Sequence, residues 1–175
     1  MAANQLNSSV RPVTAADLSW VAEIFGWYAE NSVATFEDSP RSMAWWTEHA
    51  AELADLGLPF LVAEASGAVV GYAYAAPWRR KAAYRATAED SVFISPAHTS
   101  QGVGHQLLAR LLVACSEAGV RQLIAVIADT GSDASMRLHS SAGFTQAGRL
   151  REVGFKHGRW IETMLMQRSL PSGLP

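Results

Sequence analysis

The chain has 175 residues, with 14 Lys plus Arg against 16 Asp plus Glu and a formal net charge of −2 at pH 7. Hydrophobic residues make up 49% and charged residues 17%, which excludes a disordered class and predicts a folded domain with its own core. No basic stripe stands out, so we expect no nucleic-acid partner. The single cysteine, Cys115, excludes an intramolecular disulfide, and its apolar surroundings predict that it is buried.

The two ends of the chain are small and polar, which predicts flexible tails at 1–9 and 169–175 around a single domain at 10–168. The first residues lack the pattern of a signal peptide, and no stretch approaches the roughly 20 apolar residues of a membrane-spanning helix. We therefore expect a cytoplasmic protein that does not associate with membranes.

Hydrophobic periodicity and turn residues predict the elements of the first half of the chain. In order, they are a strand at 10–13, a helix capped by Thr14 with apolar residues Leu18, Val21, Ile24 and Tyr28, a helix at about 42–56, and strands at 60–65, 68–75 and 86–95. Ser66-Gly67 permits a tight hairpin between the second and third of these strands. Pro96 prevents further ladder pairing after 86–95.

The second half begins with a polar loop and Gly102-Val103-Gly104, which open a helix that ends at Gly119. There follow an apolar central strand at 122–128, a short helix capped by Ser132 or Asp133 that stops at Gly143, and strands at 145–153 and 160–167 around a turn at 156–158. Hairpins and a crossover occur together. The sequence therefore predicts an α/β fold whose mixed sheet carries helices on both faces.

The glycine turn before the third long helix has the features of an anion site. Gly102 and Gly104 let backbone N–H groups approach an anion closely, and the dipole of the following helix favours negative charge. A diphosphate suits such a turn. Two glycines are also common in turns that bind no ligand, so the surrounding sequence has to support the interpretation of an anion site.

The surrounding sequence resembles the GNAT N-acetyltransferase superfamily. Residues 91–104 are similar to its motif A, whose loop reads Gln/Arg-x-x-Gly-x-Gly/Ala, and 138–144 are similar to the end of its motif B. Segments that narrow the resemblance to the phosphinothricin and methionine sulfoximine acetyltransferase branch are 34–37, 77–79, Tyr84 to Glu89, and 154–160. The resemblance covers about 10–168. It implies the GNAT fold with a mostly antiparallel sheet, acetyl-CoA as cosubstrate, and no metal.

The same resemblance implies a set of cofactor-binding positions. They are Phe93, Ile94, Ser100, Gln101, Gly102, Val103, Gly104, Ser132 and Ser135, with a backbone N–H near Phe93 or Ile94 as the oxyanion donor. Two positions depart from the family pattern. Thr99 stands where the loop usually begins with Gln or Arg, and Ser132 where motif B usually opens with Asn. Because main-chain donors remain in place, we expect coenzyme A binding to survive with reduced affinity.

Acetyl transfer from a thioester to an amine needs an unprotonated amine and a group that protonates the departing thiolate. The resemblance makes Glu89 the candidate base and Asp90 the spare candidate, although a solvated strand-end carboxylate is the ordinary alternative. His139 lies four residues before Gly143, where this branch commonly carries His. It is the candidate acid or auxiliary base. The alternative is that a lone histidine on a helix has a structural role.

The resemblance also implies an acceptor site lined by Phe36, Glu37, Arg79 and Tyr84. Arg79 is the expected partner of an acceptor carboxylate, although its cluster with Arg80, Lys81 and Arg85 also suits a solvated surface. Trp45 and Trp46 are expected in the core or an interface. Lys156 and Trp160 reach either the site or a partner subunit, since this branch is commonly dimeric and a homodimer is expected.

These observations predict an acetyl-CoA-dependent N-acetyltransferase that acts on the α-amine of a small amino-acid analogue such as phosphinothricin, methionine sulfoximine or methionine sulfone. Two alternatives stay open. The same chemistry can serve another amine, namely a polyamine, an aminoglycoside or a protein N-terminus. The departures at Thr99 and Ser132 also suit a non-catalytic acyl-CoA-binding sensor.

Overall fold

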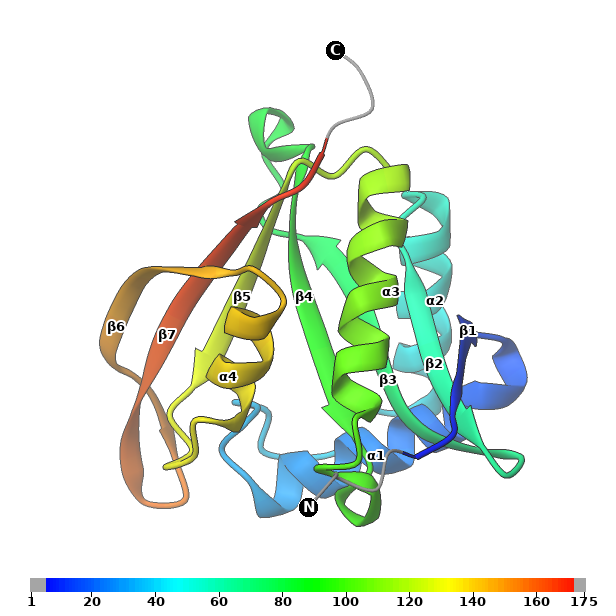
Figure 1. Ribbon diagram of the computed structural model, residues 1–175. Coiled ribbons are helices and arrows are strands. Elements are labelled where there is room, and N and C mark those ends of the chain that lie inside the picture. Colours follow the sequence, from blue (N-terminus) through cyan, green and yellow to red (C-terminus); the bar gives the residue numbers. More distant parts are fainter. Residues whose placement is uncertain (1–5, 172–175) are drawn as a thin grey trace.

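The computed structural model describes residues 6–171, which form one seven-stranded sheet in the order β1-β2-β3-β4-β5-β7-β6 (Figure 1). The strands are β1 (Ser9–Pro12), β2 (Phe60–Ala65), β3 (Ala68–Pro77), β4 (Thr87–Ile94), β5 (Gln122–Ala128), β6 (Thr145–Lys156) and β7 (Arg159–Ser169). All neighbours pair antiparallel except β4 and β5, which pair parallel. This confirms the predicted α/β fold with a mixed, mostly antiparallel sheet.

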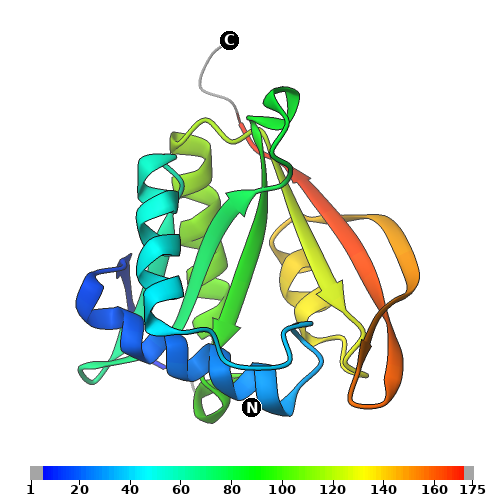
Figure 2. The ribbon, with the colours of Figure 1, turned by 180° about the vertical axis from the view of Figure 1, so that it is seen from behind.

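The helices cover both faces of the sheet, as the sequence predicts. They are α1 (Leu18–Asn31), α2 (Met43–Asp55), α3 (Val103–Glu117) and α4 (Ala134–Ser141), with short 3-10 helices at Ala15–Asp17, Ala82–Tyr84 and Pro96–His98. In Figure 1 α3 and α4 lie in front of the sheet, and the view from behind in Figure 2 shows α1 and α2 on the other face. The first face is called here the α3/α4 face and the second the α1/α2 face.

Each face has its own apolar core. On the α3/α4 face, Leu107, Leu108 and Leu111 pack against strand residues, and Cys115 is fully buried among them, as predicted. On the α1/α2 face an aromatic layer surrounds Trp46, which is completely buried and contacts Phe25 at a centroid distance of 5.5 Å. Trp46 is therefore a core residue.

The observed elements differ from the predicted ones mainly at their ends. Thr14 precedes a 3-10 turn, and α1 itself begins at Leu18. Strand β6 continues to Lys156 because residues 154–156 pair with β7 although their hydrophobic alternation is broken by a bulge. The hairpin at Ser66-Gly67 is confirmed, with φ values of +52° and +80° that suit the turn preferred between twisted strands.

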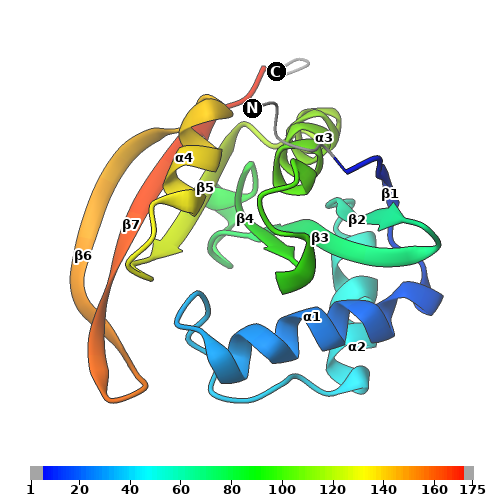
Figure 3. The same ribbon diagram turned by 60° about the horizontal axis from the view of Figure 1, so that its bottom comes forward.

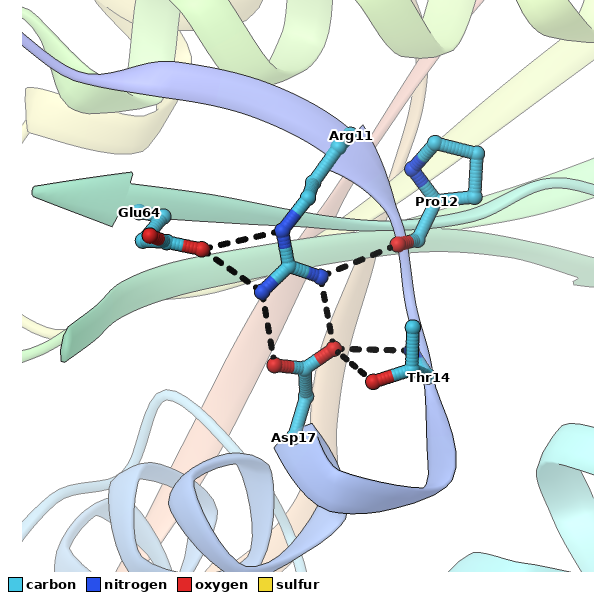
Figure 4. A network of polar contacts seen from close by, with 5 residues as sticks. All are labelled: Arg11, Pro12, Thr14, Asp17 and Glu64. Atoms are coloured by element: carbon cyan, nitrogen blue, oxygen red, sulfur yellow. Dashed lines mark hydrogen bonds and ion pairs between the residues drawn. The ribbon is translucent and has the colours of Figure 1, made fainter. Parts of the chain in front are cut away.

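A polar network joins β1, the first 3-10 helix and β2 (Figure 4). The Arg11 guanidinium donates to both oxygens of Asp17, at 2.7 and 2.8 Å, and to Glu64. Asp17 also accepts from the amide and the hydroxyl of Thr14. The hydrogen bonds from Arg11 hold the pKa of Asp17 well below its usual range, although burial opposes this. The network fixes the start of the chain against the sheet.

The ends of the described chain are packed against the domain. Leu6 N–H donates to the Gln101 carbonyl at 3.0 Å, and the Ser8 hydroxyl donates to Gln106 at 2.7 Å. Leu170 is buried, and its N–H donates to the Arg121 carbonyl at 2.9 Å. The remainder of the two expected tails, 1–5 and 172–175, lies outside the described residues. Within 6–171, no helix is long and apolar enough to cross a membrane.

Candidate active site

The two central parallel strands diverge halfway along their length. Strand β4 pairs with β5 only from Thr87 to Asp90, opposite 122–125. Beyond this point β4 stays paired with β3 as far as Ile94, and β5 stays paired with β7 as far as Ala128, so each strand follows its outer neighbour (Figure 1). The facing edges of 91–94 and 126–128 therefore no longer pair with each other. Backbone hydrogen-bonding groups at such an edge are available to an extended ligand.

The loop from the end of β4 to α3 adopts the conformation that the glycine turn predicts. Ser100 has a φ of +60°, and Gly102 has a φ of +85° as the residue that caps α3. The first N–H groups of an α-helix have no partner within the helix, so this end suits an anion. The Thr99 hydroxyl donates to the Pro96 carbonyl at 3.2 Å, so its hydrogen is engaged within the loop.

Gly104 has a different role from Gly102. Its φ is not positive, and a Cβ added to it would lie 3.3 Å from Leu138 Cδ2 on α4. Gly104 thus lies where α3 and α4 approach each other next to the loop, and a larger residue would require the Leu138 side chain to shift. Of the other predicted cofactor positions, Phe93 points its ring into the aromatic layer of the α1/α2 face, where it stacks on Tyr72. Only the main chain of Phe93 faces the divergent edge.

Other predicted cofactor positions lie around the start of α4. The Ser132 hydroxyl accepts from Ala134 N–H at 3.3 Å, and the Ser135 carbonyl contacts the ring of His139. The Ile94 carbonyl accepts a 2.8 Å hydrogen bond from the Tyr28 hydroxyl, which fixes the end of β4 against α1.

Glu89 projects to the α1/α2 face at the point where the strands diverge. It is partly buried, and burial raises its pKa, with a further contribution from Asp90; the charge of Arg79 opposes this. The hydroxyl of Tyr74 lies in the same electrostatic neighbourhood. Burial and the Glu89 charge raise the pKa of Tyr74, whereas a hydrogen bond with Ser91 lowers it. A carboxyl group whose pKa is raised in this way accepts a proton more readily than a fully solvated carboxylate.

Asp90 projects to the opposite face and forms a buried ion pair with His139 of α4. The Asp90 Oδ2 and His139 Nε2 atoms are 2.9 Å apart, and the side chains are 1% and 5% exposed. The other ring nitrogen, Nδ1, lies 2.8 Å from the Ser135 carbonyl. Burial disfavours the charged ring, but the hydrogen bond and charge of Asp90 outweigh it and raise the pKa of His139.

The protonation state of the His139 ring follows from the hydrogen-bond partners of its two nitrogens. A carbonyl oxygen only accepts, so Nδ1 carries a hydrogen, and an ionised carboxylate also only accepts, so Nε2 carries one too. The arrangement therefore favours an imidazolium beside a carboxylate. The second Asp90 oxygen, Oδ1, is buried without a protein partner. Because this pairing engages Asp90, the carboxylate free for the α1/α2 face is Glu89.

The predicted acceptor residues lie on two segments. Phe36 and Glu37 belong to the loop between α1 and α2, where Glu37 pairs with Arg41. Arg79 and Tyr84 belong to the β3–β4 connection. Arg79 is exposed and makes a cation–π contact with the Trp78 ring, with 4.9 Å between its guanidinium carbon and the ring centroid. Its charge also acts on Glu89. Tyr84 is 43% exposed and lies in the 3-10 helix that precedes β4.

Sequence reasoning missed two contributors to this region, and it left open whether a third, Lys156, reaches the site or a partner subunit. Tyr74 on β3 lies near Glu89, and Arg41 before α2 lies near Tyr74, since the charges of Glu89 and Arg41 both act on the Tyr74 hydroxyl. Lys156 is buried and binds the α1–α2 loop rather than solvent.

A divergent pair of central parallel strands is followed by a glycine-capped helix, with a carboxyl group of raised pKa on one face and a buried histidine–aspartate pair on the other, an arrangement suited to acyl transfer. The family model of the acetyltransferase (GNAT) domain matches residues 10–165, and the chain belongs to this family. It is accordingly an N-acetyltransferase.

Curated relatives are similar in sequence to most of the chain. A phosphinothricin N-acetyltransferase of Alcaligenes faecalis is 46% identical over 165 residues, which cover 94% of this chain and 84% of that protein. An L-methionine sulfoximine/L-methionine sulfone acetyltransferase of Salmonella typhimurium is 36% identical over 93% of this chain and 94% of its own. The crystal structure of a phosphinothricin acetyltransferase from Sinorhizobium meliloti in complex with AcCoA has a TM-score of 0.90, with 40% identity and coverage of 94% and 89%.

Proposed function

We propose that the protein transfers an acetyl group from acetyl-CoA to the α-amine of a small amino-acid analogue of the phosphinothricin, methionine sulfoximine or methionine sulfone type. The observation that carries this proposal is the placement of Glu89 and the Asp90–His139 pair on opposite faces of β4, where β4 and β5 diverge. The names of the similar enzymes support the choice of acceptor.

The chain offers a fitting place for acetyl-CoA. The divergent edges of β4 and β5 provide main-chain donors for an extended arm, and the loop at 100–104 presents the N-terminal amides of α3 to a diphosphate. When bound, the cosubstrate supplies the acetyl group in activated form as a thioester. The described residues around the loop carry no acidic side chain between Ser95 and Glu117, so charge does not oppose an anion there.

Proton transfers can be assigned to the two faces of β4. Glu89, whose pKa is raised by burial, accepts the proton that the acceptor ammonium must lose before it can attack. The His139 imidazolium, held by Asp90 and Ser135, is the proton carrier on the other face, and it protonates a departing thiolate when one of these two hydrogen bonds opens. The acceptor therefore approaches from the α1/α2 face, and the thiol leaves toward the α3/α4 face.

The acceptor side carries both signs of charge. Arg79 and Arg41 offer cationic partners for an α-carboxylate, and Glu89 and Glu37 face an ammonium group. A zwitterionic amino acid matches this pattern better than a polyamine, which has no anionic group to pair with the arginines. This balance favours the amino-acid analogue over the polyamine and aminoglycoside alternatives.

The test is to incubate the protein with acetyl-CoA and a panel of amines while following release of free thiol. Phosphinothricin, methionine sulfoximine and methionine sulfone should be acetylated, and spermidine, an aminoglycoside and a peptide with a free N-terminus should not. Turnover of the peptide alone would move the assignment to a protein N-terminus. Acetyl-CoA binding by calorimetry, without turnover of any amine, would support the non-catalytic sensor instead.

We propose in addition that the protein is a homodimer. Strand β6 is an edge of the sheet, and exposed apolar side chains gather on it and on the start of β7, namely Leu150, Val153, Phe155 and Trp160. Phe155 and Trp160 contact each other at a centroid distance of 5.2 Å while each is 59% exposed. Such an edge favours self-association.

The homodimer is tested by light scattering. The wild type should give twice the chain mass, and Phe155→Glu should give a monomer. A monomeric wild type would refute the proposal.

A further inference from the structure

The connection between α1 and α2, residues 32–42, crosses the α1/α2 face toward the far side of the sheet. In Figure 3 it runs from the end of α1 toward β5 and β7 before it returns to α2. Val33 packs with Ala128 at the end of β5 and Ile161 on β7 in a small apolar cluster. The connection is called here the crossing loop. It carries Phe36, Glu37 and Arg41, so its position shapes the acceptor side of the site.

A buried lysine holds the crossing loop from the edge of the sheet. Lys156, the last residue of β6, is 3% exposed, and its ammonium donates to the carbonyls of Thr35 and Glu37 at 2.9 and 2.6 Å. A buried ammonium without hydrogen bonds is strongly unfavourable, so the two carbonyls cannot leave without a penalty. The lysine thus fixes main-chain atoms on both sides of Phe36.

A glycine two residues earlier on β6 completes the contact. The Phe36 ring lies directly against Gly154, so closely that an added Cβ would come within 2.5 Å of Phe36 Cζ. The space for the ring exists only because position 154 has no side chain. Gly154 and Lys156 face the same side of β6, as residues two apart in a strand do. One short segment of β6 therefore receives Phe36 and binds the carbonyls that flank it.

The crossing loop also reaches the reacting side of β4. Glu37 pairs with Arg41, and the charges of both act on the Tyr74 hydroxyl, which the charge of Glu89 also influences. A shift of the loop therefore moves Glu37 and Arg41 relative to Glu89. Because Asp90 and His139 lie on the other face of the sheet, the same shift leaves them in place.

We infer that Lys156 and Gly154 form a latch that positions the crossing loop and thereby sets the affinity for the acceptor amine. Lys156 is a positioning residue in this role, since it acts through Thr35, Phe36 and Glu37 and not on the reacting atoms. The inference rests on the proposed function for its kinetic consequence, but not for the latch itself. It predicts that the latch affects acceptor binding and leaves acetyl-CoA binding unaffected.

The experiment compares Lys156→Met and Gly154→Ala with the wild type and with Arg110→Met, which removes an exposed cation from α3. Lys156→Met keeps the length of the side chain and removes the donors, whereas Gly154→Ala keeps the lysine and displaces the ring. Lys156→Arg restores a cation with several donors and should recover part of the effect. Using two independent variants keeps the test valid if one of them does not fold.

The first measurement is amide hydrogen exchange, which requires no substrate. Both latch variants should raise exchange in peptides from 32–42 at least ten-fold and leave α3 and α4 unchanged, whereas Arg110→Met should match the wild type. Unchanged exchange in 32–42 in both variants would overturn the latch, whatever the protein acetylates.

The second measurement separates the kinetic constants. A small displacement of a positioning loop can cost roughly 10- to 100-fold, so we expect that increase in the KM for the acceptor, with the KM for acetyl-CoA within about two-fold. Equal rises in both KM values, or a loss of kcat alone, would overturn the positioning role. Lack of turnover by the wild type on every amine would refute the proposed function, and the exchange result would still decide the latch.

Discussion

Asp90→Asn should destabilise the protein, because it removes the charge that keeps a proton on His139. The two side chains are 1% and 5% exposed and 2.9 Å apart. Removing one partner of a buried ion pair costs about 3 to 5 kcal/mol when the other charge stays trapped. In Asp90→Asn, His139 can instead release its proton and accept a hydrogen bond from the asparagine amide. We therefore expect a smaller cost of about 2 kcal/mol, which is typical of the loss of one charged hydrogen bond. This corresponds to a fall in Tm of about 4 to 8 °C.

The effect of Asp90→Asn should depend on pH with a definite sign. The folded-state pKa of His139 is raised, so the pair contributes stability that is fully present below the unfolded value of about 6.5 and is lost as pH rises through the folded pKa. Thermal unfolding from about pH 5 to 9 should therefore show the largest difference in Tm at the acidic end. His139→Gln and the double variant complete a cycle that isolates the pair. A constant difference across pH, or a cycle without coupling, would refute the ion pair.

Four further outcomes are expected. Glu89→Gln should lower kcat by about 100- to 10,000-fold in the thiol-release assay with little change in acceptor KM, and turnover at the wild-type rate would remove Glu89 as the base. Gly102→Val, strained at a φ of +85°, should abolish calorimetric binding of acetyl-CoA, whereas Gly119→Val, at +81° beyond the far end of α3, should not. Arg79→Ala should raise the KM for a free amino acid about ten-fold and leave that for its methyl ester unchanged; equal effects would exclude a carboxylate contact. Asp17→Asn should lower the unfolding free energy by about 1 to 2 kcal/mol at pH 7. Because the pKa of Asp17 is lowered, this difference should begin to shrink below about pH 4 and be lost as pH falls through the lowered folded pKa.

Local features of the sequence were sufficient to predict most of the fold. The apolar spacing of α3, the glycine that caps it and the Ser66-Gly67 turn each determine their structure through neighbours in the chain. The ends of β6 and β7 were less predictable. Their last residues join the sheet through cross-strand pairing, which overrides the local pattern at the bulge.

The candidate site was predictable as a set of residues but not as an arrangement. Glu89 and Asp90 are adjacent in the sequence, and strand alternation places them on opposite faces. Which face receives α4, and therefore which carboxylate meets His139, depends on packing between segments 49 residues apart. The contacts of Lys156 were less accessible still. Its partners are main-chain carbonyls about 120 residues away, and a backbone carbonyl leaves no mark in the sequence.

Side chains along β4 alternate between the two faces of the sheet, so the face that each of Glu89 and Asp90 occupies is sensitive to the length of the chain before them. A single-residue deletion ahead of Glu89 that shifted the pairing of β4 with β3 by one residue would send the carboxylate of Glu89 to the side of α4 and leave the α1/α2 face without it. Substitutions at the same positions change one group at a time, but an insertion or deletion exchanges the chemistry of both sides at once. The β3–β4 connection can therefore vary in length among such enzymes only where the pairing of Pro77 with Ala88 and of Ala76 with Glu89 is preserved.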